Sequence, residues 1–353
     1  MSLLRNDKID MFRCLGILLV VLGHTQGLPS EIHRYIYSFH MPAFFVLSGY
    51  LFNIDKARRF PVVYGVDKFR RLIIPAWCLG AICGLPFVIK LAIHKISLAI
   101  FLSLLWGAFV GFPRADGNFL STPLWFLFCL YCLEMMAAVV AQITVRFAGP
   151  SMIVVGVIGL ASSGSLPFIP FDIHIALSAA FYFGIGMLVK ESGALPFEPS
   201  ERSMARACAT AGLATAWALL TSVAWEPISM SDSSFGSTIS SMSINVISAL
   251  LGTMMLCQIA TNLPDARALR GIGTRTLPIL GFNYVVSAGV VHFLNAIHAN
   301  QWGRSFVMQA AILVAIAWSL DRAGSIGDVL NGRRRQKAHA SSESRPPSAR
   351  SAT

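Results

Sequence analysis

The chain has 353 residues, of which 55% are hydrophobic and only 13% are charged, and its formal net charge is +11. Together with a mean hydropathy of +0.64, this composition excludes an ordinary water-soluble domain and indicates a polytopic membrane protein. Apolar stretches recur from Phe12 to Leu320, and about 17 to 25 such residues cross a ~30 Å hydrocarbon core as a helix. Because the stretches are continuous rather than alternating, they predict an all-α helical bundle and not a β-barrel.

The sequence predicts about ten membrane-spanning helices. In chain order they cover residues 12–28, 35–54, 72–93, 124–145, 152–168, 173–189, 205–223, 239–260, 277–297 and 306–320. The first helix is expected to stay in the mature chain, because no small-residue cleavage site follows it. The apolar segment 97–112 has about 16 residues, which is short for a span, so we interpret it as interfacial or re-entrant. Eleven spans are the alternative, if this segment crosses the membrane.

The basic residues predict the orientation of these helices. Four basic clusters fall on one side of the predicted membrane: Lys56, Arg58, Arg59, Lys68, Arg70 and Arg71 after the second span, Arg202 and Arg206 before the seventh, Arg267, Arg270 and Arg275 before the ninth, and Arg333, Arg334, Arg335 and Lys337 after the tenth. By the positive-inside rule this side is cytoplasmic, and both termini lie there. We expect the clusters to contact anionic lipid and not nucleic acid.

Residues 1–325 then form one integral membrane domain, and residues 326–353 form a basic tail rich in Ser, Pro and Ala that we expect to be disordered. The seven cysteines are scattered, and Cys129 and Cys132 lie in one apolar helix. An odd count in this arrangement argues against a disulfide framework or a zinc site, so no bound metal is expected.

Two polar side chains, Arg13 and His24, stand out in the otherwise apolar first helix. Eleven helical steps separate them, which returns the chain to within about 20° of the same face and places the residues about 16 Å apart along the axis. Ionisable groups at membrane depth are energetically unfavourable and mark functional sites by default. We therefore predict that both face one interior channel, Arg13 at its cytoplasmic mouth and His24 toward the outer surface. An ion pair between Asp10 and Arg13 is the structural alternative.

Three further residues are candidates for the same site. His40 precedes Met41 and Pro42, and Pro suits the first turn of a helix, so His40 is expected where the second helix re-enters from outside. Two imidazoles near the outer face could form a base and its orienting partner, or each could simply bond a carbonyl at a helix end. Glu134 lies in the middle of the fourth span and needs a partner or a water-filled cavity. Trp125 begins this span, where tryptophan is commonly an interfacial anchor.

At these residues the chain resembles the acyltransferase-3 family of integral membrane acyltransferases. The matching segments occur in order: K-I-D-M-F-R over 8–13, the ten-residue gap between Arg13 and His24, S-F-H-M-P-A-F-F-V-L-S-G-Y-L-F over 38–52, K-F-R-R-L-I-I-P over 68–75, and P-L-W-F-L over 123–127. The F-H-M-P form resembles the branch that O-acetylates sugars of surface polysaccharides. The whole chain is similar to the acetyltransferases of xanthan-type exopolysaccharide clusters.

The resemblance implies acetyl-coenzyme A as a co-substrate, with no permanently bound cofactor, and a sugar hydroxyl of an exopolysaccharide or its lipid-linked repeat unit as the acceptor. It implies essential roles for Arg13 and His24. Further roles carry over to the matching positions, which are His40, Lys68, Arg71 and Trp125. The expected location is the bacterial cytoplasmic membrane, with membrane lipids and other polysaccharide-assembly proteins as partners.

Two positions depart from the family pattern. Many relatives have a histidine a few residues after the segment that matches 276–280, whereas this chain has Gly281, Phe282 and Asn283. In the branch that acts on lipopolysaccharide, a glutamate often follows the matching tryptophan by five residues, and here Leu130 occupies that place. A catalytic role for Glu134 therefore rests on its depth in the membrane and not on the resemblance.

These residues suggest a mechanism. Arg13, with Lys68 and Arg71, would bind the coenzyme phosphates through forked and charge-assisted hydrogen bonds. His24 would act as a general base on the sugar hydroxyl, or would carry the acetyl group as a transient acetyl-imidazole. A protonated His40 could stabilise the developing oxyanion. Two other classes of function stay open at this point: a polysaccharide or small-molecule transporter or flippase, and a structural subunit of a glycan-export complex.

Overall fold

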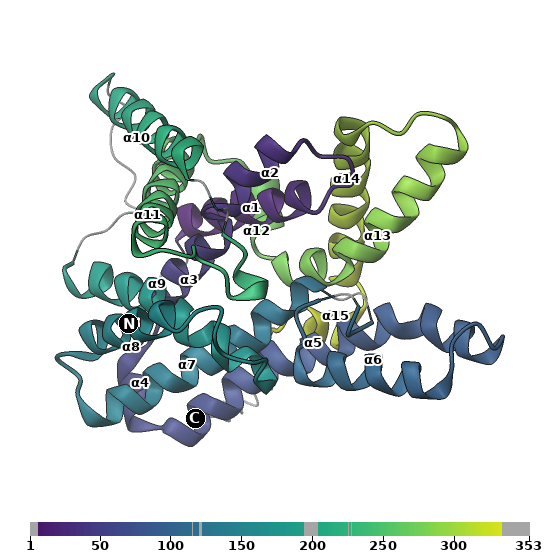
Figure 1. The fold of residues 1–353 in the computed structure, drawn as a ribbon, viewed down its shortest axis with the longest axis horizontal. Coiled ribbons are helices and arrows are strands. Elements are labelled where there is room, and N and C mark those ends of the chain that lie inside the picture. Colours follow the sequence, from purple (N-terminus) through teal and green to yellow (C-terminus); the bar gives the residue numbers. More distant parts are fainter. Residues whose placement is uncertain are drawn as a thin grey trace, which may run out of the picture.

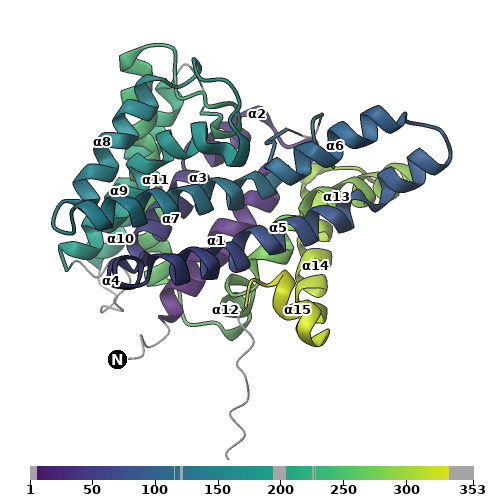
Figure 2. The ribbon, with the colours of Figure 1, turned by 90° about the horizontal axis from the view of Figure 1, so that it is seen from below.

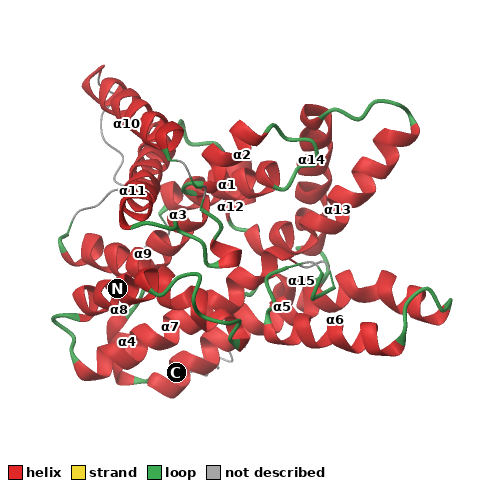
Figure 3. Ribbon diagram, in the orientation of Figure 1, coloured by secondary structure: helices red, strands yellow, loops and turns green. Residues whose placement is uncertain are grey.

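The computed structural model describes residues 6–114, 116–119, 122–193, 204–224, 226 and 228–333. Arg202 and the tail from residue 334 onward, with the three basic residues predicted there, lie outside these ranges. Within them every regular element is a helix, apart from an isolated bridge between Ser229 and Ser234, as Figure 3 shows. The predicted all-α fold class is confirmed.

The helices follow one another with short connections. Their bounds are α1 (Asp7–Gly23), α2 (Ser30–Tyr37), α3 (His40–Leu51), α4 (Ile54–Arg59), α5 (Pro61–Ala92), α6 (Leu98–Val110), η1 (Thr122–Leu124), α7 (Trp125–Ile143), α8 (Ala148–Ala161), η2 (Pro170–Asp172), α9 (Ile173–Glu191), α10 (Met204–Val223), η3 (Met230–Asp232), α11 (Ile239–Asn262), α12 (Arg267–Gly273), α13 (Thr276–Ala296), α14 (Trp302–Leu320) and α15 (Gly324–Leu330).

The N-terminal helix α1 lies at the centre of the bundle. It contacts α2, α3, α11, α12, α13 and α14, so residues on its different faces meet six other helices. Helix α9 packs on α3 on one side and α8 packs on α9, while α5 packs on α7. The hairpins α10/α11, α13/α14 and α5/α6 extend outward from this centre (Figures 1 and 2). Every residue of α1 is therefore buried or half-buried in the bundle.

Glycines set the closest helix crossings. A side chain at Gly49 of α3 would collide with the carbonyl oxygen of Phe183 on α9, and one at Gly186 of α9 would collide with the carbonyl oxygen of Val46. Small residues let helix backbones approach closely, which is how helices commonly associate in membranes. Gly273 does the same at the end of α12, where a Cβ atom would meet the carbonyl oxygen of Asp10 on α1. This contact fixes α12 against the N-terminal part of α1.

Six helical segments in the described part are long and apolar enough to cross a membrane: Pro61–Ala92, Trp125–Ile143, Pro170–Glu191, Ile239–Asn262, Thr276–Ala296 and Trp302–Leu320. The other four predicted spans correspond to α1, to the α2–α3 pair, to α8 and to α10, which are helical but shorter or less apolar. The count of ten spans and the cytoplasmic orientation of the termini therefore stay predictions. Helix α6, in the segment 97–112, has 13 residues, which is about 20 Å and short of a ~30 Å core.

Three predicted spans end differently in the structure; in one of them, predicted over 152–168, helix α8 already ends at Ala161. The span predicted over 35–54 is broken, because α2 ends at Tyr37 and α3 begins at His40, with Phe39 outside helical geometry between them. Pro42, in the first turn of α3, explains the break, because proline lacks the N–H that would bond back to the preceding turn. The first span, predicted over 12–28, stops at Gly23 as a helix, and Gly27 then turns the chain with a φ of 77°.

The ends of several helices are tied together where the basic residues cluster. Arg270 of α12 pairs with Asp7 of α1, and Asp321, after α14, binds both Arg275 and Arg333. The tail is predicted to begin at residue 326, and the first residues of this segment belong to helix α15 (Gly324–Leu330), which packs on α5. Apolar residues such as Leu330, which is 3% exposed, account for this docking.

Candidate functional site

An interior cavity of about 300 Å³ opens beside the first helix. Its walls come from α1, α3, α5, α7, the α12–α13 junction and the residues after α15; the polar lining residues are Arg13, Ser48, Arg71, Thr274, Thr276 and Asn331. We call it the inner cavity. Its volume is at the lower end of the range for small-molecule sites, about 300–1,000 Å³.

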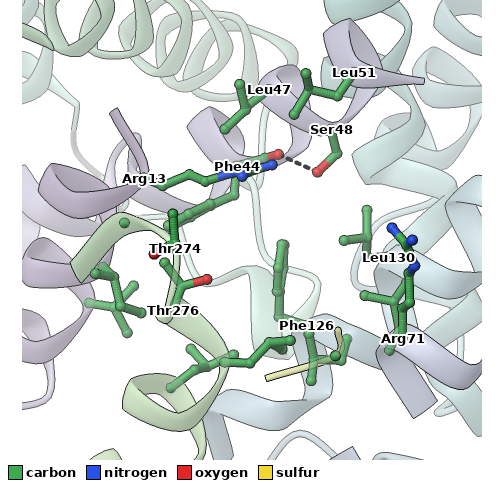
Figure 4. Close-up of a pocket in the computed structure, with 18 of the residues that line it drawn as sticks. Arg13, Phe44, Leu47, Ser48, Leu51, Arg71, Phe126, Leu130, Thr274 and Thr276 are labelled. Atoms are coloured by element: carbon green, nitrogen blue, oxygen red, sulfur yellow. Dashed lines mark hydrogen bonds between the residues drawn. The ribbon is translucent and has the colours of Figure 1, made fainter. Parts of the chain in front are cut away.

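Two arginines enter the inner cavity from different helices. Figure 4 shows Arg13 near Phe44 and Thr274 on one side, and Arg71 near Leu130 on the other. Arg13 Nη1 lies 3.5 Å from the Asp10 carboxylate, so the predicted pair exists, yet the Arg13 side chain is still 37% exposed. Arg71 Nε lies 3.7 Å from Asp67, and its side chain is 49% exposed. Both guanidinium groups therefore stay accessible to an anion in the cavity.

Several residues of the inner cavity were not predicted from the sequence. Thr274 and Thr276 flank the start of α13, and the positive end of a helix dipole favours negative charge. Gly332 closes another wall, and it sits so close to α5 that a Cβ atom would lie 2.6 Å from the carbonyl oxygen of Arg71. These residues are 260 or more positions from Arg13 in the chain, so no local motif could have indicated them.

A second, smaller cavity of about 50 Å³ lies at the other end of α1. Four aromatic side chains line it: His24, Tyr37, His40 and Trp125. We call it the outer cavity. The Tyr37 ring meets both imidazoles edge-on, with centroids 6.1 Å from His24 and 4.8 Å from His40. The structure thus brings together His24, His40 and Trp125 as predicted, and it adds Tyr37, which the sequence analysis did not select.

Hydrogen bonding determines the tautomer of His40. Its Nδ1 lies 2.8 Å from the carbonyl oxygen of Ile36. Because a carbonyl oxygen only accepts, Nδ1 must carry the proton, and the neutral ring then has an unprotonated Nε2. His40 is 3% exposed and lines the outer cavity. It can therefore accept a hydrogen bond from a hydroxyl group placed there.

The inner and outer cavities meet along α1. Three apolar residues, Val20, Met41 and Leu280, line both of them. On α1, Arg13, Ile17, Val20 and His24 follow one another at spacings of four, three and four residues, which keeps them on one face. The arginine and the imidazole thus border two adjoining cavities on the same side of the helix and lie about 16 Å apart along its axis at 1.5 Å per residue.

Glu134 and Lys68 form a separate buried cluster. Lys68 donates to one carboxylate oxygen of Glu134, and the hydroxyl of Tyr64 donates to the other. Glu134 is 3% exposed. The ion pair with Lys68 supplies the partner that a carboxylate in the middle of a membrane span requires. Neither Lys68 nor Glu134 is among the residues that line the inner and outer cavities. The geometry thus gives no support to coenzyme binding by Lys68 or to catalysis by Glu134.

A serine-rich loop covers the outer cavity. Ile228, Met230 and Ser231 belong to its wall. The loop is held where the carboxylate of Glu226 accepts from both the amide and the hydroxyl of Ser237, and these bonds lower the pKa of Glu226. With only about 50 Å³, the outer cavity in this conformation has room for about one water at about 30 Å³ each, and a larger acceptor does not fit in it.

Comparison with known proteins gives one match. The acyltransferase-3 family model, described as an acyltransferase domain, matches residues 6–321. No curated protein and no solved structure matches the chain. The matched region contains both cavities, apart from the short segment after α15.

Proposed function

The chain belongs to the acyltransferase-3 family and is therefore an acyltransferase; on that premise we propose that it O-acetylates a sugar of a surface polysaccharide or of its lipid-linked repeat unit. The proposed donor is acetyl-coenzyme A from the cytoplasm, and the proposed location is the bacterial cytoplasmic membrane. The observation that carries the proposal is the pair of adjoining cavities along α1 that share three lining residues, with arginines at one end and imidazoles at the other.

The inner cavity suits the donor. The coenzyme is strongly anionic, and Arg13 and Arg71 line the inner cavity on two sides. Guanidinium groups bind phosphate through forked hydrogen bonds. The start of α13 adds a favourable dipole. We assign the phosphates to this end because the helix termini that surround it carry the basic clusters expected on the cytoplasmic side. The pantetheine arm would then extend past Val20 toward His24.

The outer cavity suits the transfer step. We assign His24 as the general base, because it ends the helix that carries Arg13 and so lies where an extended thioester arrives. A ring nitrogen of His24 takes the proton of the sugar hydroxyl while the hydroxyl oxygen attacks the thioester carbonyl carbon. The carbon–sulfur bond then breaks, and the coenzyme thiolate takes the proton from the imidazolium. General bases of this kind contribute about 10² to 10⁴ in rate.

His40 and Trp125 complete the proposed acceptor site. The unprotonated Nε2 of His40 accepts a hydrogen bond from a second hydroxyl of the acceptor and so orients the sugar ring. Trp125 is 6% exposed, which argues against a purely interfacial anchor, and its face offers an apolar surface to the sugar. We leave Lys68 and Glu134 out of this site because each is already engaged by the other.

The decisive experiment measures acetyl transfer directly. Membranes from cells with and without the gene are incubated with acetyl-labelled coenzyme A, and the label on isolated glycan is counted. We expect label on the glycan only when the gene is present, and an active-site variant, His24→Ala, should remain in the membrane and transfer none. Glycan movement across the membrane without any acetylation would instead favour a transporter, and label on glycan in equal amount without the gene would refute the proposal.

A further inference from the structure

An open hollow of about 720 Å³ lies at the outer end of the bundle, next to the α1–α2 loop. Its six lining residues are Gln26, Gly27, Asn300, Gln301, Trp302 and Gly303. Gly27 takes a φ of 77°, and a Cβ atom there would lie 4.0 Å from Cβ of Trp302. This glycine therefore turns the loop against α14, and the hollow is formed between segments far apart in the chain.

The chemistry of this hollow matches a neutral saccharide. Three of its side chains are carboxamides, which both donate and accept hydrogen bonds, as sugar hydroxyls do. Trp302 is 39% exposed, and its large ring can cover the apolar face of a pyranose. None of the six lining residues is charged. A phosphate or a lipid headgroup would be recognised by cationic side chains, such as the arginines of the inner cavity. Because no cationic side chain lines this hollow, the lining points to an uncharged ligand.

The amide of Asn300 is already oriented. Its Nδ2 donates to Oδ1 of Asn295 at 2.7 Å, and its Oδ1 accepts from the hydroxyl of Ser305 at 3.1 Å. Each of these atoms keeps one further donor hydrogen or lone pair. Gln301 precedes α14 without capping it through its side chain. A side-chain amide that hydrogen bonds already hold in place loses less conformational entropy when a ligand binds than a mobile side-chain amide does.

The hollow adjoins the proposed transfer site through the chain itself. His24 lines the outer cavity, and Gln26 and Gly27, two and three residues later, line the hollow. Beneath them, Thr25 bonds to Gln309 of α14 at 3.4 Å in the buried interior. The loop after α1 thus presents the base on one side and the amide-lined hollow on the other. The outer cavity holds only about 50 Å³, so the rest of a saccharide chain must lie elsewhere.

We propose that this hollow is a saccharide subsite, in which Trp302 stacks on a sugar residue next to the one that is acetylated, and Gln26, Asn300 and Gln301 bond its hydroxyls. The inference rests on the proposed function for the identity of the acceptor. A tryptophan at a helix end can also be a simple interfacial anchor, and the chain supplies a matched control for that role. Trp318 lies near the other end of the same helix α14 and is 46% exposed.

The test uses the full-length protein in detergent micelles and a defined probe. The probe is a neutral oligosaccharide mixture released from the host cell's surface polysaccharide by partial acid hydrolysis and stripped of acetyl groups with mild base. Saturation-transfer NMR first measures contact between probe and protein without coenzyme. Transfer from labelled acetyl-coenzyme A then gives kcat and the KM for each substrate. The variants are Trp302→Ala, Gln26→Leu and Trp318→Ala.

We expect Trp302→Ala to lose most of the saturation transfer to the probe and to raise the KM for the oligosaccharide about tenfold. Its KM for acetyl-coenzyme A and its kcat should stay near wild type, because the reacting groups are untouched. Gln26→Leu should raise the same KM less, and Trp318→Ala should leave it unchanged. Wild-type probe binding and KM in both Trp302→Ala and Gln26→Leu would overturn the subsite. If the wild type binds the probe through Trp302 but transfers no acetyl group, the proposed function fails and the subsite stands.

Discussion

A single substitution between the two cavities should separate donor binding from acetyl transfer. Val20 is 2% exposed and lines both cavities, on the face of α1 that carries Arg13 and His24. The outer cavity is about 50 Å³, less than two waters at about 30 Å³ each. The aromatic ring introduced by Val20→Phe therefore fills the junction that the thioester must pass. Because a misplacement of about 1 Å can lower a rate 100-fold, we expect transfer to fall at least about 100-fold.

The neighbouring residue provides the control. Val21 is 1% exposed in the same helix and packs in the same hydrophobic core, but it is not among the lining residues of the inner and outer cavities. Overpacking should destabilise Val20→Phe and Val21→Phe alike, by about 1–3 kcal/mol, which thermal unfolding in detergent measures. Transfer should be lost only in Val20→Phe, whose acetyl-coenzyme A affinity should persist because both cavity arginines are intact. Equal transfer rates in the two variants would refute the joined path.

Three other outcomes follow from the site. His24→Ala should reduce labelled acetyl transfer by about 10² to 10⁴ at unchanged acetyl-coenzyme A affinity, whereas Arg13→Lys should weaken that affinity because a point charge replaces a forked donor; equilibrium binding and product counting distinguish the two. Lys68→Met should lower the free energy of unfolding by about 3 kcal/mol, because it leaves a buried carboxylate unpaired, and adding Glu134→Gln should restore much of it. If the double variant folds but no longer binds acetyl-coenzyme A, the lysine binds the coenzyme after all. Because hydrogen bonding lowers the pKa of Glu226, the loop contact it makes is complete above about pH 4.3 and is lost as the pH falls through the lowered value. Protease cleavage of this loop should therefore be faster in that acidic range than at neutral pH, and Glu226→Gln should raise the cleavage rate at neutral pH. Equal cleavage of the wild-type loop in the acidic range and at neutral pH would contradict the assignment.

The alignment of Arg13 with His24 was predictable because helix geometry is local. An uninterrupted α-helix from Asp7 to Gly23 carries residues at multiples of 3.6 onto one face whatever packs around it. The sequence also indicated that this face is interior, since a guanidinium facing lipid would be unfavourable. The sequence did not indicate which residues form the rest of the inner cavity. Gly332 and Thr274, for example, reach this cavity only through tertiary packing.

The break before His40 and the partner of Glu134 were beyond sequence patterns for different reasons. Hydropathy over 35–54 is continuous, so a window average hides a change of direction at Phe39 that depends on backbone geometry. The partner of Glu134 lies 66 residues away, at Lys68. The charge pattern gave equal weight to all the basic residues after the second span, and only the fold separates Arg71, in the cavity, from Lys68, in an ion pair.

The distribution of charge along the path gives a physical reason for directional transfer under the proposed function. Arginines border the inner cavity, while the junction with the outer cavity is formed by three apolar side chains, those of Val20, Met41 and Leu280. An anionic coenzyme headgroup is stabilised at the arginines and would be desolvated at the junction without compensation, so only the neutral acetyl-thioester end can advance. The outer cavity itself, with about 50 Å³, leaves little room for water. Exclusion of water from a closed site suppresses hydrolysis of a reactive group, so the acetyl group meets the acceptor hydroxyl before it meets solvent.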